Sequence, residues 1–304
     1  MLKRIILIIF LIIIGLAFGT LMYLKQAVYT PLNKSDNHKK LFVVPQRTST
    51  QNLSRKLKET GLIKSPLAFV IYSKIKRINL QAGQYKFSPS MTIATIVNDI
   101  STGKVVEYKV TFPEGLRITQ MADILESQEV VKKQDFLKAA QGQEGYLFPD
   151  TYSFSSGISA NQIVKIMKDN FQQRTSEVRI TPRILILASI VEKEISATDD
   201  RSKIAGVYTN RLNINMLLQA DPTVQYAKGT WDAITQSDYE TVISPYNTYL
   251  NAGLPPGPIC NPGIASIEAA ANPAKHEYFY FFHKNGQTVY SKTFIEHQNN
   301  LAKY

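Results

Sequence analysis

Residues Thr181 to Ile195 read TPRILILASIVEKEI, an apolar stretch that ends in two glutamates. Thr181 can cap the free amides of a helix, and Pro182 suits the first helical position because its missing N–H needs no partner there. The apolar residues that follow predict a buried helix. A carboxylate at the carboxyl end of a helix faces the negative end of the helix dipole, and burial disfavours its charge further. Both effects raise the carboxyl pKa, which suits a general acid.

Helical geometry gives the two glutamates different neighbours. Glu192 shares a face with Ala188 and Ser189, whose small side chains leave room for a ligand. Glu194 lies beside bulky aliphatic residues and fits a group paired with a buried cation or a backbone donor. The alternative is that both glutamates form structural ion pairs at the rim of a core.

Composition narrows the class of protein. The single cysteine, Cys260, excludes an intrachain disulfide, and the four histidines lack the spacing of metal ligands, so no metal or cofactor is implied. The net charge of +11 fits a chain that works near an anionic surface, whether membrane, cell-wall polymer or nucleic acid. Nucleic acid is not an expected partner, because no aromatic and basic constellation of a nucleic-acid-binding module is present.

The N-terminus predicts a membrane segment. An almost unbroken apolar run from Ile5 to Leu24 is long enough to cross a bilayer as a helix. Lys3 and Arg4 precede it, which predicts a short cytoplasmic tip with the rest of the chain outside. We therefore expect residues 1–25 to form an uncleaved signal anchor, with a cleaved signal peptide as the alternative. Residues 26–40 are polar and predict a linker that holds the folded part away from the bilayer.

The remaining chain predicts an α+β fold. A small α/β module is expected over residues 41–107, and a weak internal echo predicts a second strand-helix-helix unit over residues 108–143. Residues 144–304 form the largest expected domain, of mixed α+β type. The expected strands are 41–44, 83–87, 105–112 and a strand with a turn over 144–152, with a hairpin over 277–291 turning at Asn285–Gly286. The expected helices are 50–60, 65–75, 92–100, 161–173, 181–195, 199–212 and 294–301.

Three stretches rich in turn residues predict loops that carry many amide and phenol groups: Leu218–Tyr226, Ser244–Tyr249 and Gly253–Gly263. With Tyr146 and Tyr152, such side chains suit a sugar polymer, whose rings have apolar faces and whose hydroxyls need oriented donors and acceptors. Taken singly, each stretch is explained as well by turn formation alone. Three together favour a binding site.

These motifs resemble the endolytic murein transglycosylases of the MltG (YceG-like) family. The resemblance rests on Glu144–Tyr152, Ala188–Glu194, Leu218–Tyr226, Tyr246–Tyr249, Gly253–Gly257 and Asn261–Gly263, which occur in the family's order and spacing. It covers the whole chain as a signal anchor, a LysM-like module within residues 41–107, the connector of residues 108–143 and a catalytic domain.

The resemblance implies an enzyme of the polysaccharide lyase class that cuts nascent peptidoglycan strands internally. Family members cleave the β-1,4 bond between MurNAc and GlcNAc without water and leave a 1,6-anhydro-MurNAc end, which terminates or trims the growing strand. The implied location is the outer face of the bacterial cytoplasmic membrane. The implied partners are peptidoglycan strands, that membrane and wall-synthesis enzymes such as penicillin-binding proteins.

The resemblance places the catalytic carboxyl at Glu192. The candidate substrate-binding residues come from the same motifs and from the small side chain next to Glu192: Glu144, Tyr146, Tyr152, Ser189, Gln219, Asp221, Tyr246 and Asn247. Two other functions are compatible with these residues. One is a non-catalytic membrane-anchored peptidoglycan-binding scaffold, and the other is an ordinary hydrolase that uses Asp221 as its base.

Overall fold

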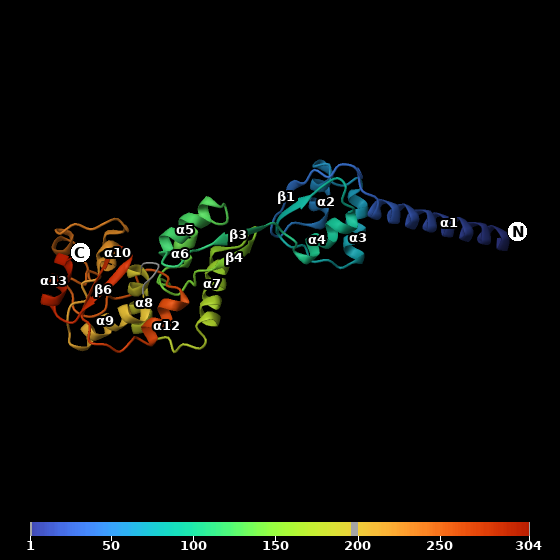
Figure 1. Cartoon of the computed structure of the whole chain (residues 1–304). Helices are drawn as coiled ribbons and strands as arrows, with labels where there is room; N and C mark the ends of the chain where they lie inside the picture. Colours follow the sequence, from blue (N-terminus) through green and yellow to red (C-terminus); the bar gives the residue numbers. More distant parts are fainter. Residues whose placement is uncertain (1, 196–199, 304) are drawn as a thin grey trace. The chain divides into compact units, whose positions relative to one another are not determined.

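A computed structural model describes residues 2–195 and 200–303, with side chains from residue 6 onward (Figure 1). Contacts divide the chain into two units, Met1–Tyr108 with Phe154–Gly157, and Lys109–Ser153 with Ile158–Tyr304. The described elements confirm a mixed α+β protein with an N-terminal apolar helix. Its strands form three separate two-stranded sheets, β1-β2, β3-β4 and β5-β6.

The first unit packs three short helices and a long one against a small sheet. Its elements are α1 (Leu2–Tyr29), β1 (Lys40–Val44), α2 (Thr50–Glu59), α3 (Pro66–Ile75), β2 (Gly83–Phe87) and α4 (Ile93–Thr102). β1 and β2 pair antiparallel with Phe42 opposite Tyr85, and alternate residues of both strands are buried. Side-chain hydroxyls of Ser49, Ser65 and Thr92 cap the three short helices.

Helix α1 contains one span, Ile6–Tyr29, that is long and apolar enough to cross a membrane. The helix runs four residues beyond the expected end of the anchor at residue 25, so the predicted linker begins too early. Val28 is only 4% exposed and joins the core of the first unit, with Leu24 and Ala27 packed against it. Ala27 and Val28, which lie within the predicted linker, thus belong to α1 and pack it against the rest of the first unit.

The second unit is mainly helical. After β3 (Glu107–Thr111) it contains α5 (Ile118–Ser127), α6 (Lys133–Ala139), β4 (Thr151–Ser155), α7 (Ala160–Arg174), α8 (Pro182–Glu194), α9 (Arg201–Asn213), α10 (Asp221–Lys228), α11 (Asp238–Thr241), α12 (Ile264–Ala271), β5 (Tyr280–Lys284), β6 (Gln287–Ser291) and α13 (Phe294–Lys303). β3 and the two helices after it follow the same order as β1, α2 and α3 in the first unit. At the hairpin turn, Asn285 and Gly286 both have positive φ angles, of 51° and 73°, as a type I′ turn requires.

Helix α8 lies at the centre of this unit, packed against α9 and α12. Every residue from Leu185 to Val191 is buried, which confirms the expectation from its sequence. Thr181 accepts the amide of Ile184 and Pro182 opens the helix.

Two predictions in this unit are wrong. Residues Leu218–Tyr226 are not all loop, because α10 begins at Asp221. Pro222 fits the first helical turn, where no N–H is needed, and Val224 supplies a buried contact. The predicted strand within 144–152 begins only at Thr151, since the preceding residues form turns. Asp199, the expected first residue of the next helix, lies outside the described residues, and the acidic side chain of Asp200 caps that helix.

Candidate active site

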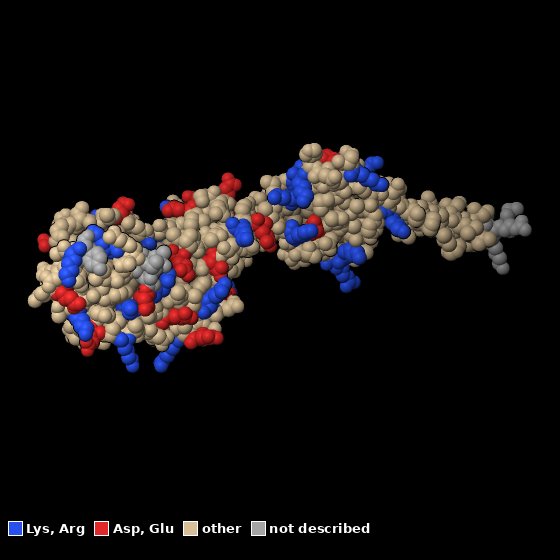
Figure 2. All heavy atoms as spheres, in the orientation of Figure 1, with Lys and Arg blue, Asp and Glu red and all other residues tan. Residues whose placement is uncertain are grey.

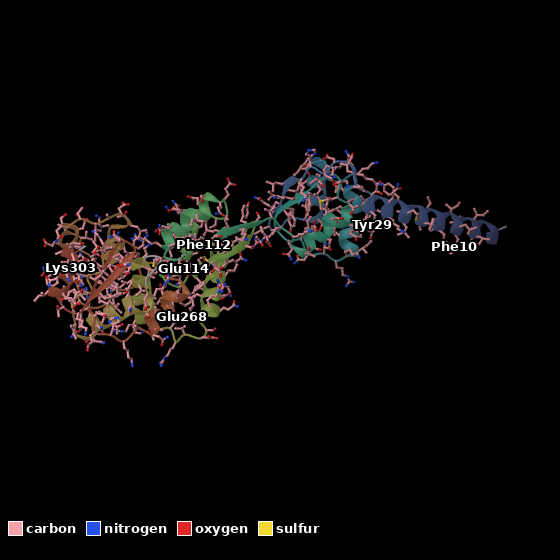
Figure 3. The ribbon with its side chains drawn as sticks, in the orientation of Figure 1. Phe10, Tyr29, Phe112, Glu114, Glu268 and Lys303 are labelled. Atoms are coloured by element: carbon pink, nitrogen blue, oxygen red, sulfur yellow. The ribbon has the colours of Figure 1, made fainter. Side chains whose placement is uncertain are left out.

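The Glu192 carboxylate accepts hydrogen bonds from the start of helix α12. Its Oε2 atom accepts the Gly263 amide at 3.0 Å, and the Ser266 hydroxyl also hydrogen-bonds to the carboxylate. Burial raises the pKa of Glu192, these two hydrogen bonds oppose the rise, and the nearby Glu114 carboxylate adds to it. A side chain at Gly263 would collide with the Glu114 carboxylate, so glycine permits this close approach. Figure 3 labels Glu114.

The expected ligand space beside Glu192 is filled by protein. Ala188 and Ser189 are 0% exposed. The Ser189 hydroxyl accepts the Ile259 amide at 3.0 Å, and the Cys260 thiol donates to the Ser189 carbonyl at 3.3 Å. The small residues therefore make room for the loop before α12, and the prediction of a ligand at this position is wrong.

The side chain of Glu194 projects from the opposite side of the carboxyl end of α8 and lines a cavity of about 510 Å³. Its Oε1 atom accepts the Tyr208 hydroxyl at 2.6 Å, so one partner of Glu194 is a tyrosine from α9. Burial raises the pKa of Tyr208, and the charge of Glu194 raises it further. The other lining residues are Tyr208, Arg211, Gln219, Asp221, Tyr239, Tyr249, Tyr280, Phe281, Phe282, His283, Phe294 and His297.

Asp221 is the second carboxylate of this cavity. It opens helix α10, and its Oδ1 accepts the Tyr249 hydroxyl at 2.5 Å. The Tyr239 ring stacks on Tyr249 with centroids 4.1 Å apart. Gln219, just before the helix, has a positive φ of 49°, and its backbone N–H donates a hydrogen bond to the Thr248 carbonyl. The cavity therefore combines two carboxyl groups with amide and phenol groups, the chemistry expected of a sugar site.

The sequence did not indicate that Arg211 and the aromatic residues of the predicted hairpin line this cavity. Arg211 is 7% exposed, and its guanidinium donates to the carbonyls of Phe279 at 2.6 Å and Leu218 at 2.7 Å. The arginine thus ties the hairpin to the start of the α10 segment. A signal was present, since a cation close to Val207 and Tyr208 in a buried helix needs specific partners.

Three other predicted residues line a separate cavity of about 280 Å³, namely Glu144, Tyr146 and Tyr246. Glu144 accepts the Ile118 amide at 3.1 Å and the side-chain amide of Asn261 at 2.9 Å. Burial raises the pKa of Glu144 to about 7, against the opposing effect of these hydrogen bonds and of Arg117. The structure therefore places five of the predicted substrate-binding residues in two separate cavities, and Glu192 lines neither of the two.

Glu144 gives a pH dependence that can be measured. We expect the free energy of unfolding to fall by about 2 kcal/mol as the pH rises from about 5 to about 7, because the folded protein keeps a proton that the unfolded chain releases. Glu144→Gln stays neutral and should lack this slope in urea titrations over that range. Glu268→Gln, at an exposed position, is the matched control. Equal slopes in the Glu144 and Glu268 variants would contradict the prediction.

The structure buries three of the predicted substrate-binding residues. Ser189 and Asn247 are 0% exposed and Tyr152 is 7% exposed. Asn247 donates to the carbonyls of Tyr239 and Val242, and Tyr152 donates to the carbonyl of Phe148 at 2.6 Å. Direct contact with substrate is therefore not supported for these residues. Their polar groups instead form hydrogen bonds with the backbone of nearby segments.

A row of stacked cations and rings also escaped prediction. The buried Arg117 guanidinium lies 3.8 Å from the Trp231 ring centroid and 4.7 Å from that of Tyr226. The Lys193 ammonium, between the two glutamates of α8, lies 4.1 Å from the Trp231 centroid. The row anchors the segment after α10 to α8. Among the described residues, no three His, Cys, Asp or Glu side chains are placed to hold a metal ion.

Comparison with known proteins agrees with the motifs. Residues 42–303 match the model of the YceG-like family. An endolytic murein transglycosylase from Bacillus subtilis (strain 168) is 33% identical over 94% of this chain and 90% of that protein. One from Streptococcus pneumoniae (strain D39) is 28% identical over 92% of this chain, which spans 61% of that longer relative.

A solved structure is also similar. The crystal structure of a yceG-like protein from Listeria monocytogenes superposes with a TM-score of 0.58 at 35% sequence identity, over 86% of this chain and 99% of that one. The family model and the Bacillus relative both extend over most of the sequence. The chain therefore belongs to the YceG-like family, as its motifs predicted.

Proposed function

We propose that this protein is an endolytic peptidoglycan transglycosylase, a lyase that cleaves nascent glycan strands internally. The names of its relatives support this activity. The observation that carries the proposal is the 510 Å³ cavity in which Glu194 meets Gln219, Asp221 and several tyrosines. Aromatic faces and oriented polar groups around a carboxyl group are what a sugar-cleaving site requires.

We assign the acid to Glu194 rather than to Glu192. Glu194 lines the cavity, and the Tyr208 hydroxyl fixes its orientation. Glu192 instead accepts two hydrogen bonds at the start of α12, which stabilises that helix. The acid thus remains within the motif predicted from the sequence, but it is Glu194 and not Glu192, two residues earlier.

The proposed reaction needs one carboxyl group that acts twice. Glu194 in its protonated form donates its proton to the bridging oxygen as the bond from MurNAc C1 to that oxygen breaks. The C6 hydroxyl of the same MurNAc then bonds to C1 and gives its proton to the Glu194 carboxylate. The carboxyl is restored, no water is consumed, and the product has a 1,6-anhydro end.

The tyrosines and Asp221 would bind and orient the strand. Asp221 already accepts the Tyr249 hydroxyl, and the stacked pair of Tyr239 and Tyr249 presents a flat apolar surface. A sugar ring packs well on such a surface. In a hydrolase, Asp221 would instead activate a water molecule. Because this second carboxylate is present in the cavity, hydrolysis is the alternative that the experiment below must distinguish.

We further propose that α1 anchors the protein in the cytoplasmic membrane, with residues 1–4 in the cytoplasm and both units outside. The length and hydropathy of Ile6–Tyr29 and the preceding Lys3 and Arg4 support this orientation. The order β1, α2, α3, β2 supports a LysM-like module that holds glycan. Wall-synthesis enzymes such as penicillin-binding proteins would then work beside it.

Product mass tests the proposal. The full-length protein is incubated with uncrosslinked glycan strands and the products are analysed by mass spectrometry. We expect internal fragments whose ends are one water lighter than a reducing sugar. Reducing ends would establish hydrolysis instead, and intact strands that remain bound would establish a non-catalytic scaffold.

A further inference from the structure

Helix α3 has an apolar stripe that faces away from the core of its unit. Its other face is buried, with Ala68 and Phe69 at 0% exposed. Leu67, Ile71 and Ile75 recur every four residues, and Leu67 and Ile75 are 63% and 71% exposed. Such a stripe on an otherwise packed helix indicates contact with another apolar phase.

The stripe adjoins a groove shared with α1. The groove has a volume of about 430 Å³, and its apolar lining includes Leu21, Leu24, Val28 and Ile71. Lys25 and Lys76 also line it, and each carries its charge on a flexible stem. The membrane-length helix itself therefore supplies one wall of the groove.

The position of the groove along α1 places it at the surface of a bilayer. About 20 helical residues cross the hydrocarbon core, so a span that begins at Ile6 reaches the headgroups near Lys25. Tyr29 lies where α1 meets the first unit, whereas Phe10 lies far out on the helix (Figure 3). The rings of Tyr29 and Tyr72 meet edge to face at 6.1 Å, and tyrosines are common at membrane–water interfaces.

Charge is distributed to match an anionic surface. Residues 1–108 contain 16 Lys and Arg against 4 Asp and Glu, whereas residues 109–304 contain 19 against 20. The sequence has no acidic residue from Gly61 to Asn98, which includes all of α3. Figure 2 shows Lys and Arg side chains around the first unit. Basic residues next to a membrane helix are attracted to anionic lipid headgroups.

We propose that α3 is an interfacial helix that seats the first unit on the outer leaflet. Leu67, Ile71 and Ile75 enter the leaflet, and the groove holds an acyl chain of an anionic phospholipid whose phosphate lies between Lys25 and Lys76. This proposal rests on the membrane anchoring by α1 in the proposed function. It requires nothing of the catalytic reaction.

Spin labels on the full-length protein in phosphatidylglycerol vesicles test the seating. Nitroxides are attached at Ile75→Cys, at Phe10→Cys in α1 and at Lys58→Cys on the exposed face of α2; the native Cys260 is 0% exposed. We expect labels at positions 10 and 75 to collide with oxygen more than with a water-soluble nickel chelate, and the label at position 58 to do the reverse. A water-exposed label at position 75 beside a lipid-exposed one at position 10 would overturn the seating alone. A water-exposed label at position 10 would overturn the anchoring as well.

A second arm tests the headgroup contact. Lys25→Gln combined with Lys76→Gln should lower the equilibrium constant for seating the position-75 label by about 30-fold in phosphatidylglycerol. Lys56→Gln with Lys58→Gln, on the exposed face of α2, should leave it unchanged. In phosphatidylcholine vesicles, the parent protein should show the same fall in the seating constant as the Lys25 and Lys76 double variant shows in phosphatidylglycerol. If the two double variants seat equally well in phosphatidylglycerol, the assigned phosphate site is wrong.

Discussion

Glu194→Gln is expected to reduce cleavage of uncrosslinked glycan strands by about 10²- to 10⁴-fold, the usual contribution of a positioned acid–base group. Glutamine keeps the size of the side chain and can still accept the Tyr208 hydroxyl, so the cavity should keep its shape. Strand binding should therefore survive. The rate of product formation by the full-length protein, measured beside strand retention, separates loss of chemistry from loss of binding.

Glu192→Gln is the matched control on the same helix. Its amide oxygen can replace the carboxylate as acceptor for the Gly263 amide, so cleavage should remain within about tenfold of the parent. Thermal unfolding of both variants shows whether either has lost its fold. If cleavage disappears in a folded Glu192→Gln and persists in Glu194→Gln, the acid is Glu192, as the motif alone indicated.

Asn261→Ala is expected to lower the free energy of unfolding by about 3–5 kcal/mol. Asn261 is fully buried, and its Oδ1 accepts the amides of Gly145 at 2.9 Å and Leu147 at 3.0 Å. Its Nδ2 donates to the Leu116 carbonyl at 3.0 Å and to Glu144 at 2.9 Å. Alanine would leave these buried groups without their partners. Urea unfolding of the full-length protein measures the loss.

Asn272→Ala provides the comparison. Asn272 is exposed, and its side chain donates to the Glu268 carbonyl at the long distance of 3.5 Å. Its substitution should change stability by less than about 0.5 kcal/mol. Similar losses in the two variants would show that Asn261 does not hold the segment around Glu144 in place.

Local signals in the sequence were sufficient for most elements of this fold. Thr181 and Pro182 mark the start of α8, and Asn285–Gly286 marks the hairpin turn, because capping and positive φ angles depend on a few adjacent residues. Local signals misled at Asp221–Lys228. A proline there reads as a turn in isolation but fits the first turn of a helix whose Val224 packs into the core.

The candidate site was predictable as a set of motifs but not as a geometry. Gln219 and Asp221 were expected to line a sugar groove, and they line the 510 Å³ cavity. Ser189 was expected beside ligand, yet the segment around Ile259, 70 residues away in sequence, occupies that space. A small residue on a helix face indicates that something approaches closely, and it does not say whether ligand or protein does so.

By itself, the sequence determined the family, the membrane-length helix, the capped helices and the paired carboxyl groups of α8, because each depends on local composition and spacing. Only the tertiary structure decided which carboxyl group lines the 510 Å³ cavity. Glu192 and Glu194 lie two residues apart, so they project to different sides of the helix end. Segments distant in the sequence decide what each side meets: the start of α12 for Glu192, and the tyrosines of α9, of α11 and of the segment after α11 for Glu194.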